Sequence, residues 1–360
     1  MIPYKREIAE LPLHNGKAPK WLFQRMKKLS REIILLFAIE NKIDEFIKKL
    51  SDPLWFQALG CILGFDWHSS GLTTTTGAAL KEGLGNLSHE IGLFIVGGKG
   101  KTALNTPEEI KMIAEKEGID PQKWITISRL VARIDNNAIQ DGYQLYHHLL
   151  IFTKSEKWCV IQQGMNDKNN FARRYHWLGE EIKSFIEEPH KGIITSKFEQ
   201  YVLNLVAKES KPAQETITYL LNEDPKKVIE LWNKISLKLP SYHPIKINDI
   251  KPENLKTILL KTYENPPKNF QETILKEGVG AKTLRALSLI SELVYHKPYS
   301  IKDPARFSFA HGGKDGYPYP VNRKVYDKSI EILEKAIKNA KMGKREEIEA
   351  LKKLSFFFKV

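Results

Sequence analysis

The chain has 360 residues, and its 56 Lys and Arg outnumber 43 Asp and Glu, which gives a formal net charge of +13. This balance favours a polyanionic partner such as nucleic acid, although a lysine-rich surface of the thermophile kind produces the same excess. The longest apolar run, residues 33–39, is too short to cross a bilayer, and the N-terminus lacks the apolar core of a signal peptide. We therefore expect a cytoplasmic protein with no membrane partner.

The two cysteines, Cys61 and Cys159, lie in apolar runs and are expected to be buried free thiols. They exclude a disulfide scaffold and a zinc ribbon. A chain of this length can bury a large core, and we expect two domains.

The first helical pattern covers residues 21–50 and has an apolar stripe that begins at Trp21. Ser51-Asp52-Pro53 ends this helix and caps a second one that continues to Leu63. Residues 64–77 follow as a run rich in hydroxyls and glycines before helical sequence at Ala78.

Hydroxyl groups and backbone amides in a loop of this kind can bind phosphate. We therefore predict contacts to DNA from Ser69, Ser70, Thr73 and Thr74, with ordinary helix capping as the alternative for one or two of them. In the same run, Asp66 and His68 are alternative metal ligands.

A buried strand is predicted over residues 91–96, and it leads into Gly97-Gly98-Lys99-Gly100-Lys101-Thr102. The Walker A pattern requires glycine five positions before Gly100, where this chain has Ile95. We therefore expect no nucleoside triphosphate. Lys99 and Lys101 can still contact a nucleic-acid phosphate, and a plain surface loop is the equal alternative.

Residues 123–138 are predicted to be helical, and residues 140–143 turn the chain into a hairpin with strands at 146–152 and 158–163. Because side chains alternate along a strand, His147 and His148 must face opposite sides of the sheet. Asp141 at the turn completes a metal-ligand set with Asp66 and His68 and suggests a metal-dependent nuclease. The second carboxylate that such a site needs on the partner strand is replaced by Gln162 and Gln163.

Residues 171–177 combine two arginines with four aromatic rings. The spacing of Phe171, Tyr175 and Leu178 predicts an amphipathic helix, with Arg173 and Arg174 on its open side. Arginine binds phosphate in a bidentate manner and aromatic rings stack on unpaired bases, so we predict that both arginines contact DNA.

The chain breaks between its halves at residues 187–192, and residues 195–293 are predicted to be almost entirely helical. We expect an α+β fold that is predominantly α. Residues 1–190 form an N-terminal domain with a small antiparallel sheet, and residues 191–360 form a helical bundle. His311 and Lys314 lie in a Gly- and Pro-rich loop that we predict contacts DNA, and two basic helices (322–340 and 344–356) end the chain.

Residues 275–283 predict a short helix, a glycine turn and a second helix. Gly278 and Gly280 give the turn backbone freedom and let the first amides of the second helix point outward, where an anion binds well. This unit, about residues 270–296, resembles the helix–hairpin–helix of DNA-binding proteins and, more narrowly, the endonuclease III-like DNA glycosylase/lyases. The matching residues are Gly278-Val279-Gly280-Ala281-Lys282-Thr283.

The resemblance implies that Lys282 is the catalytic lysine, that Asp303 is the downstream aspartate, and that Gly278, Gly280 and Thr283 contact DNA. The chain departs from the family in three respects. Glu277 replaces the usual proline, the spacing from lysine to aspartate is wider, and the cysteines for an iron–sulfur cluster are missing.

Nearly the whole chain also resembles a thermophile-enriched family catalogued only as a domain of unknown function. The matching stretches are residues 11–14, 64–71, 140–143, 172–177 and 308–316. This second resemblance implies no activity.

The sequence therefore predicts a DNA-repair enzyme that cleaves at abasic or damaged sites without a cofactor. A lysine amine can form a Schiff base with the aldehyde of an abasic sugar, and the imine then permits β-elimination. A metal-dependent nuclease and a non-catalytic DNA-binding protein are the alternatives.

Overall fold

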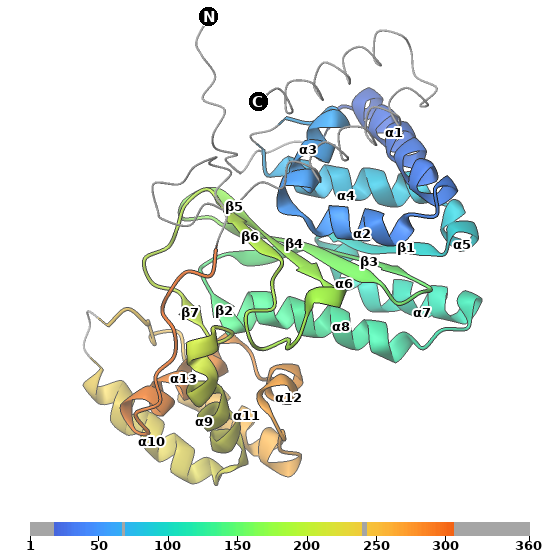
Figure 1. The fold of residues 1–360 in the computed structure, drawn as a ribbon. Coiled ribbons are helices and arrows are strands. Elements are labelled where there is room, and N and C mark those ends of the chain that lie inside the picture. Colours follow the sequence, from blue (N-terminus) through green and yellow to red (C-terminus); the bar gives the residue numbers. More distant parts are fainter. Residues whose placement is uncertain (1–17, 67–68, 240–242, 306–360) are drawn as a thin grey trace, which may run out of the picture.

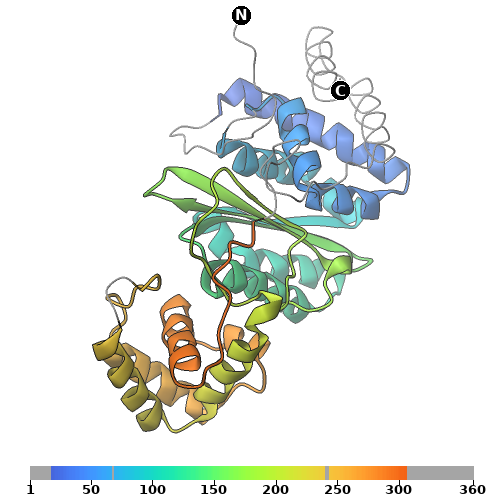
Figure 2. The same cartoon turned by 60° about the vertical axis from the view of Figure 1, so that its left-hand side comes forward.

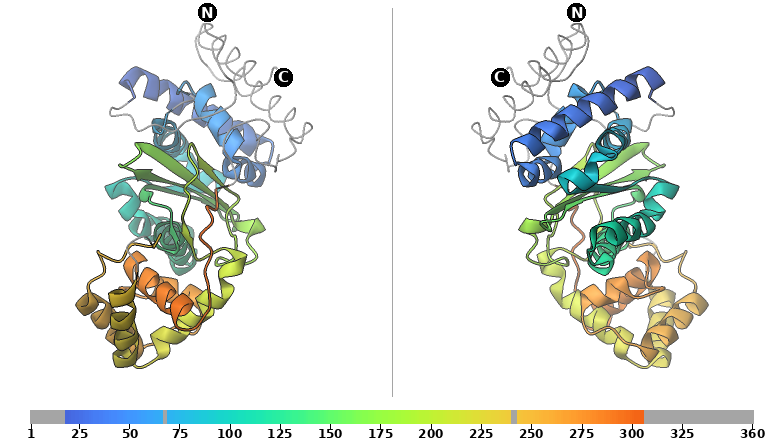
Figure 3. Two further views of the ribbon diagram at one scale, coloured as in Figure 1. Left: turned by 90° about the vertical axis from the view of Figure 1, so that its left-hand side faces the viewer. Right: turned by 90° about the vertical axis from the view of Figure 1, so that its right-hand side faces the viewer.

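The computed structural model describes residues 18–66, 69–239 and 243–305. A layer of helices covers one face of a central sheet, a second set covers the other face, and a helical bundle follows below the second set (Figure 1). The two side views in Figure 3 show the same succession of layers. The predicted α+β class, predominantly α with a small antiparallel sheet, is confirmed.

The first layer consists of α1 (Lys20–Ile39), α2 (Ile43–Ser51), α3 (Pro53–Ile62), α4 (Gly71–Leu84) and α5 (Leu87–Ile91). The single helix predicted over residues 21–50 is wrong, because the chain breaks at Asn41, whose φ is +54°. Trp21 is 61% exposed, so the buried stripe begins at Met26. The cap at Asp52 is confirmed, since its carboxylate accepts a hydrogen bond from the Trp55 amide.

The sheet has five antiparallel strands in the order β1-β3-β4-β5-β6. Their bounds are β1 (Leu93–Lys99), β3 (Gln144–Thr153), β4 (Trp158–Asn166), β5 (Phe171–Leu178) and β6 (Gly192–Thr195). The two central strands confirm the predicted hairpin. The amphipathic helix predicted over residues 171–178 is wrong, because this segment is β5, paired on both sides and covered on both faces.

The second face carries α6 (Lys101–Leu104), α7 (Thr106–Glu117) and α8 (Pro121–Arg133), and α8 continues as a π-helical turn, η1 (Ile134–Ala138). A two-stranded ribbon pairs β2 (Ile139–Gln140) with β7 (Leu203–Asn204). Two short 3₁₀ turns, η2 (Gly179–Glu181) and η3 (Lys208–Ser210), flank the passage into the bundle.

The bundle contains α9 (Lys211–Asn222), α10 (Pro225–Lys238), α11 (Pro252–Glu264), α12 (Phe270–Leu275) and α13 (Ala281–Leu293). Residues 192–195, which the sequence assigned to the second domain, form the edge strand β6 of the sheet. After α13 the chain returns toward the sheet (Figure 2), and Ser300 forms a bridge with Asn204 of β7.

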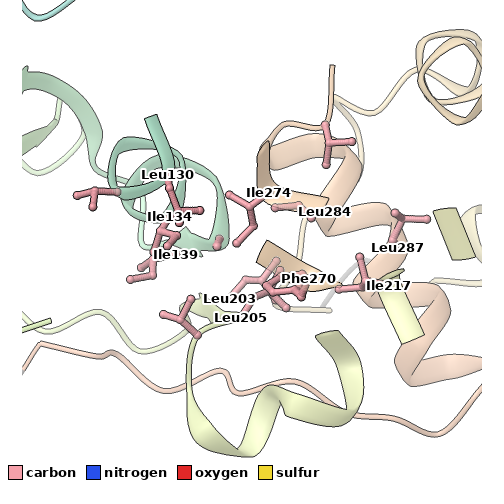
Figure 4. Packing of buried hydrophobic residues seen from close by; sticks show 14 of the residues in the cluster. Leu130, Ile134, Ile139, Leu203, Leu205, Ile217, Phe270, Ile274, Leu284 and Leu287 are labelled. Carbon is pink, nitrogen blue, oxygen red and sulfur yellow. The ribbon is translucent and has the colours of Figure 1, made fainter. Parts of the chain in front are cut away.

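Two hydrophobic clusters lie on the two faces of the sheet. One packs α1–α4 on the sheet, and the other extends from the opposite face through α8 into the bundle. Figure 4 shows this second cluster where Leu130 and Ile134 face Ile274 and Leu284. Because the core is continuous there, α12 and α13 are held against the sheet-containing part of the chain.

Candidate nucleic-acid interface

The predicted helix, glycine turn and helix is confirmed as α12, residues 276–280 and α13. Asn269 caps α12 by accepting a hydrogen bond from the Glu272 amide at 2.9 Å. The turn requires glycine at position 278, where φ is +82°, and its Val279 side chain is buried in the core. The α12–α13 corner, residues 276–280 with the first turn of α13, is therefore anchored by the apolar side chain of Val279.

The outer side of this corner faces solvent. Glu277, Gly278 and Lys282 are exposed, and no side chain of the described residues caps the N-terminus of α13 at Gly280. Gly280 has φ −119° and ψ −172°, an extended conformation open to any residue, and a Cβ built on it meets no atom of the described ranges within 4 Å. Neither backbone strain nor packing therefore requires glycine at this position. What a side chain there would obstruct is the approach of an external group to the free amides of α13.

The corner is also held by polar side chains from the sheet-containing part. Arg133 Nη1 donates to the carbonyls of Ile274 and Lys276 at 2.8 and 2.7 Å, which satisfies the end of α12. Gln140 Nε2 donates to the Ala281 carbonyl at 2.8 Å. Neither residue was found from the sequence, since both lie more than a hundred positions before the hairpin.

The Lys282 amine lies 3.5 Å from Asp249 Oδ2, and its side chain is 62% exposed. The other oxygen of Asp249 accepts a hydrogen bond from Arg285 Nη1 at 2.9 Å. Arg285 in turn donates to Gln140 Oε1 and to the Lys246 carbonyl, both at 2.9 Å. Asp249 was not identified from the sequence, because it lies in an irregular segment with no motif.

Asp303, predicted as the partner of Lys282, forms a separate and buried ion pair. Its two oxygens accept hydrogen bonds from Arg173 at 3.0 and 2.7 Å, and they also accept from the Glu199 and Ala305 amides. The structure therefore does not bring Lys282 and Asp303 together. The physical reason is the fully buried guanidinium of Arg173, which needs carboxylates to offset its lost hydration.

The prediction that Arg173 and Arg174 contact DNA is wrong, because both side chains are fully buried. They point to opposite faces of β5. Arg173 pairs with Asp141 and Asp303, whereas Arg174 donates to Gln57, Thr73 and His176. Burial alone would lower the pKa of Arg173, but these two carboxylates outweigh it and raise the pKa. Burial lowers the pKa of Arg174 to about 9.

Most of the predicted hydroxyl contacts are also wrong. The hydroxyl-rich run enters α4 at Gly71, and Ser69, Ser70 and Thr73 are buried there, with Thr73 bonded to Gln163. Thr283 is buried as well, whereas Thr74 is half-buried and bonds to the Gly71 carbonyl. Of the remaining predicted contacts, Lys99 and Lys101 are exposed, and His311 and Lys314 lie outside the described residues.

The predicted metal ligands are not assembled. Both oxygens of Asp141 are occupied, one by the Tyr143 amide and the other by Arg173 and the Tyr175 hydroxyl. Burial raises the pKa of Asp141. Asp66 is exposed, and His68 lies outside the described residues. In the ranges that the structure describes, no three His, Cys, Asp or Glu side chains are grouped so that they could hold a metal ion.

The two histidines of β3 face opposite sides, as predicted. His148 bonds to Ser128 of α8 and to Gln162, whereas His147 lies close to Gly77 of α4. Neither ring nitrogen of His147 has a partner at hydrogen-bonding geometry among the described residues. Burial lowers its pKa to about 3, although the nearby backbone of Gly98 favours the protonated ring. Both residues thus belong to the packed interior.

A cavity of about 250 Å³ opens beside the N-terminus of α13. It lies between the β2–β3 turn, the chain before β7, and the segment around Lys246. Its lining includes Gln140, Tyr143, Tyr201, Lys246, Ala281 and Arg285. This volume is slightly below the roughly 300–1,000 Å³ of ordinary small-molecule pockets, and Tyr201 is 59% exposed at the site.

The fold and the site define an α+β protein with an exposed glycine turn, a helix N-terminus that no described side chain caps, and the cations Lys246, Lys282 and Arg285 beside it. No described helix has both the length and the apolar character needed to span a membrane. The chain belongs to the family described as "Protein of unknown function (DUF763)", whose model matches residues 7–321. Neither the curated proteins nor the solved structures gave a match to the chain.

Proposed function

We propose that this protein binds DNA through the α12–α13 corner and cleaves it at abasic or damaged sites by Schiff-base chemistry at Lys282. The observation that carries the proposal is the exposed amine of Lys282, the second residue of α13, a helix whose N-terminal amides are capped by no side chain in the described ranges. Free amides at a helix N-terminus bind phosphate, so a strand held there brings its sugar close to the amine.

The surroundings of Lys282 support a nucleic-acid ligand. Lys246 and Arg285 line the adjoining cavity, and Gly280 leaves the approach to the α13 amides open. The net charge of +13 favours the approach of a polyanion. The cavity offers room for one sugar or base beside the corner, with Tyr201 at its exposed edge.

The chemistry follows from the amine. Its nitrogen adds to C1′ of the open-chain aldehyde at an abasic site, and loss of water leaves a protonated imine. The imine acidifies the hydrogens on C2′, so a base can remove one of them. The C3′–O bond then breaks, and the 3′ phosphate leaves. None of these steps requires a cofactor.

Trapping with borohydride tests the proposal. Wild-type protein incubated with abasic duplex and sodium borohydride, with EDTA present throughout, should give a stable protein–DNA adduct. Lys282→Ala should give none. Lys256→Ala is the matched control, since it removes an exposed lysine of α11 and should trap as wild type does.

Two results would contradict the proposal. If the wild-type protein forms no adduct but binds DNA in a salt-sensitive manner, the protein is a non-catalytic DNA-binding protein. If Lys282→Ala still forms the adduct at the wild-type rate, another amine carries the chemistry.

A further inference from the structure

We infer that Asp249 is the proton acceptor for Lys282, and that Arg285 positions its carboxylate. This inference rests on the proposed lyase function. It assigns the acid–base role to a residue from the segment before α11, in place of the downstream Asp303 that the sequence suggested.

The two oxygens of Asp249 have different partners. Oδ1 accepts the hydrogen bond from Arg285, and Oδ2 faces the Lys282 amine at 3.5 Å. This separation is longer than an ordinary N–H···O hydrogen bond of about 2.7–3.2 Å. Proton-transfer contacts are often long in a ligand-free site and shorten when the substrate is bound. Oδ2 is therefore the oxygen that can take a proton from the amine.

Arg285 is held in place by two partners besides Asp249. Its side chain is 19% exposed, compared with 46% for Asp249 and 62% for Lys282. The guanidinium is fixed by Gln140 Oε1 and by the Lys246 carbonyl, and Gln140 also holds the first carbonyl of α13. One framework therefore sets the positions of both the carboxylate and the helix that carries the amine. Arg285 is in this sense a positioning residue.

Asp303, the aspartate predicted from the sequence, is already bound by other residues. Asp303 is bound to Arg173 through both oxygens and is buried, so it cannot exchange protons with an exposed amine. Asp249, in contrast, is half-exposed next to the amine and can pass a proton to the sugar oxygen or to water. Among the ion pairs of the described residues, Lys282 has Asp249 as its partner.

The proton balance of imine formation fits a single carboxylate. The Lys282 ammonium gives a proton to Oδ2, and the freed electron pair forms the N–C1′ bond while the carbonyl electrons move to oxygen. Asp249 returns the proton to that oxygen. A second proton then passes from nitrogen to oxygen by the same route, and the C1′–O bond breaks to release water. The nitrogen keeps one hydrogen in the protonated imine, and Asp249 ends as it began.

The test compares Asp249→Asn with Glu253→Gln, which removes an equal charge from an exposed residue in the first turn of α11. Single-turnover trapping rates are measured from pH 6 to pH 9, together with binding to duplex that contains a tetrahydrofuran abasic analogue. At pH 7 we expect Asp249→Asn to slow trapping about tenfold or more, since a positioned acid–base group contributes roughly 10²–10⁴-fold. The deficit should shrink as pH rises, because hydroxide then replaces the lost base.

Binding gives a second readout that a purely structural role would not produce. Removal of a negative charge beside the corner should leave DNA affinity unchanged or raise it, so trapping should slow with no loss of binding. Asp249→Glu should recover part of the trapping rate that Asp249→Asn loses. The trapping rate of Arg285→Lys should lie between those of the wild type and Asp249→Asn.

If Asp249→Asn and Glu253→Gln trap at the same rate at every pH while the wild type forms its adduct, the inference is wrong and the proposed function survives. If the wild type forms no adduct, the proposed function and this inference fail together.

Discussion

Replacement of Gly280 by aspartate is predicted to stabilise the fold and weaken DNA binding. Gly280 is the N-cap residue of α13 and has an extended backbone. In the part of the chain that the structure describes, no side chain caps this helix and a Cβ built on Gly280 meets no atom within 4 Å. An aspartate can therefore enter without strain, accept hydrogen bonds from the first amides and interact with the positive end of the helix dipole.

The added carboxylate is expected to raise the free energy of unfolding and to lower the affinity for DNA. Aspartate exceeds glycine as a cap by a few tenths of a kcal/mol, and the dipole adds about 0.3–1 kcal/mol, so the gain in unfolding free energy should be ~0.5–1 kcal/mol. The same carboxylate occupies the amides that are proposed to hold phosphate. We expect affinity for the abasic-analogue duplex to fall at least tenfold, which equals about 1.4 kcal/mol.

The assays are urea denaturation and fluorescence anisotropy with labelled duplex at fixed salt. Gly118→Asp is the matched control, because it adds the same charge at an exposed glycine that ends α7. Its φ of +67° makes aspartate cost about 1–2 kcal/mol of stability, but DNA affinity should stay at the wild-type value. A stabilised Gly280→Asp protein that binds DNA as well as wild type would contradict the proposal that the N-terminal amides of α13 hold a DNA phosphate.

Three further predictions concern the framework. Asp303→Asn should destabilise the fold by about 1.5–3 kcal/mol in urea titrations, because the buried Arg173 keeps Asp141 but loses the charged acceptor of two hydrogen bonds; an unchanged free energy of unfolding would contradict a structural role. Arg133→Gln should cost about 1.5–3 kcal/mol and slow trapping, since the carbonyls of Ile274 and Lys276 lose their charged donor; unchanged trapping would show that the corner needs no such support. His147→Gln should flatten the pH dependence of stability between pH 3 and 6.5. Between these pH values the imidazole is protonated in the unfolded chain but not in the folded protein. The wild-type free energy of unfolding, which keeps the full contribution of neutral His147 above pH 6.5, therefore falls by up to ~1.4 kcal/mol per pH unit as the pH drops toward 3. Equal slopes for the two proteins would exclude His147 as the cause.

The parts of the fold that depend on neighbouring residues were predictable. The cap at Asp52, the hairpin of β3 and β4, and the turn at Gly278 each depend on residues within a few positions of one another. The fold class followed from these local patterns. The break at Asn41 was missed because the apolar period continues through it while the backbone does not.

The β5 strand shows why local pattern fails in a sheet covered on both faces. The apolar spacing of residues 171–178 matches a helix, but pairing with β4 and β6 decides the conformation. The partners that allow Arg173 and Arg174 to be buried come from distant positions such as Asp141, Asp303 and Gln57. A sequence pattern contains no sign of such partners, so the arginines were predicted to face solvent.

The same limit applies to the candidate site. The glycine turn and Lys282 were found because they form one short motif. Asp249, Arg133 and Gln140 reach that motif only through the tertiary fold, across 33 or more positions. The sequence therefore located the amine but not the carboxylate beside it.

The most direct test of the account is to identify the modified residue itself. The adduct formed with abasic DNA and borohydride is digested with protease and nuclease, and the peptides are analysed by mass spectrometry. We expect the sugar remnant on the side chain of Lys282. Attachment to another lysine or to the N-terminal amine would contradict it.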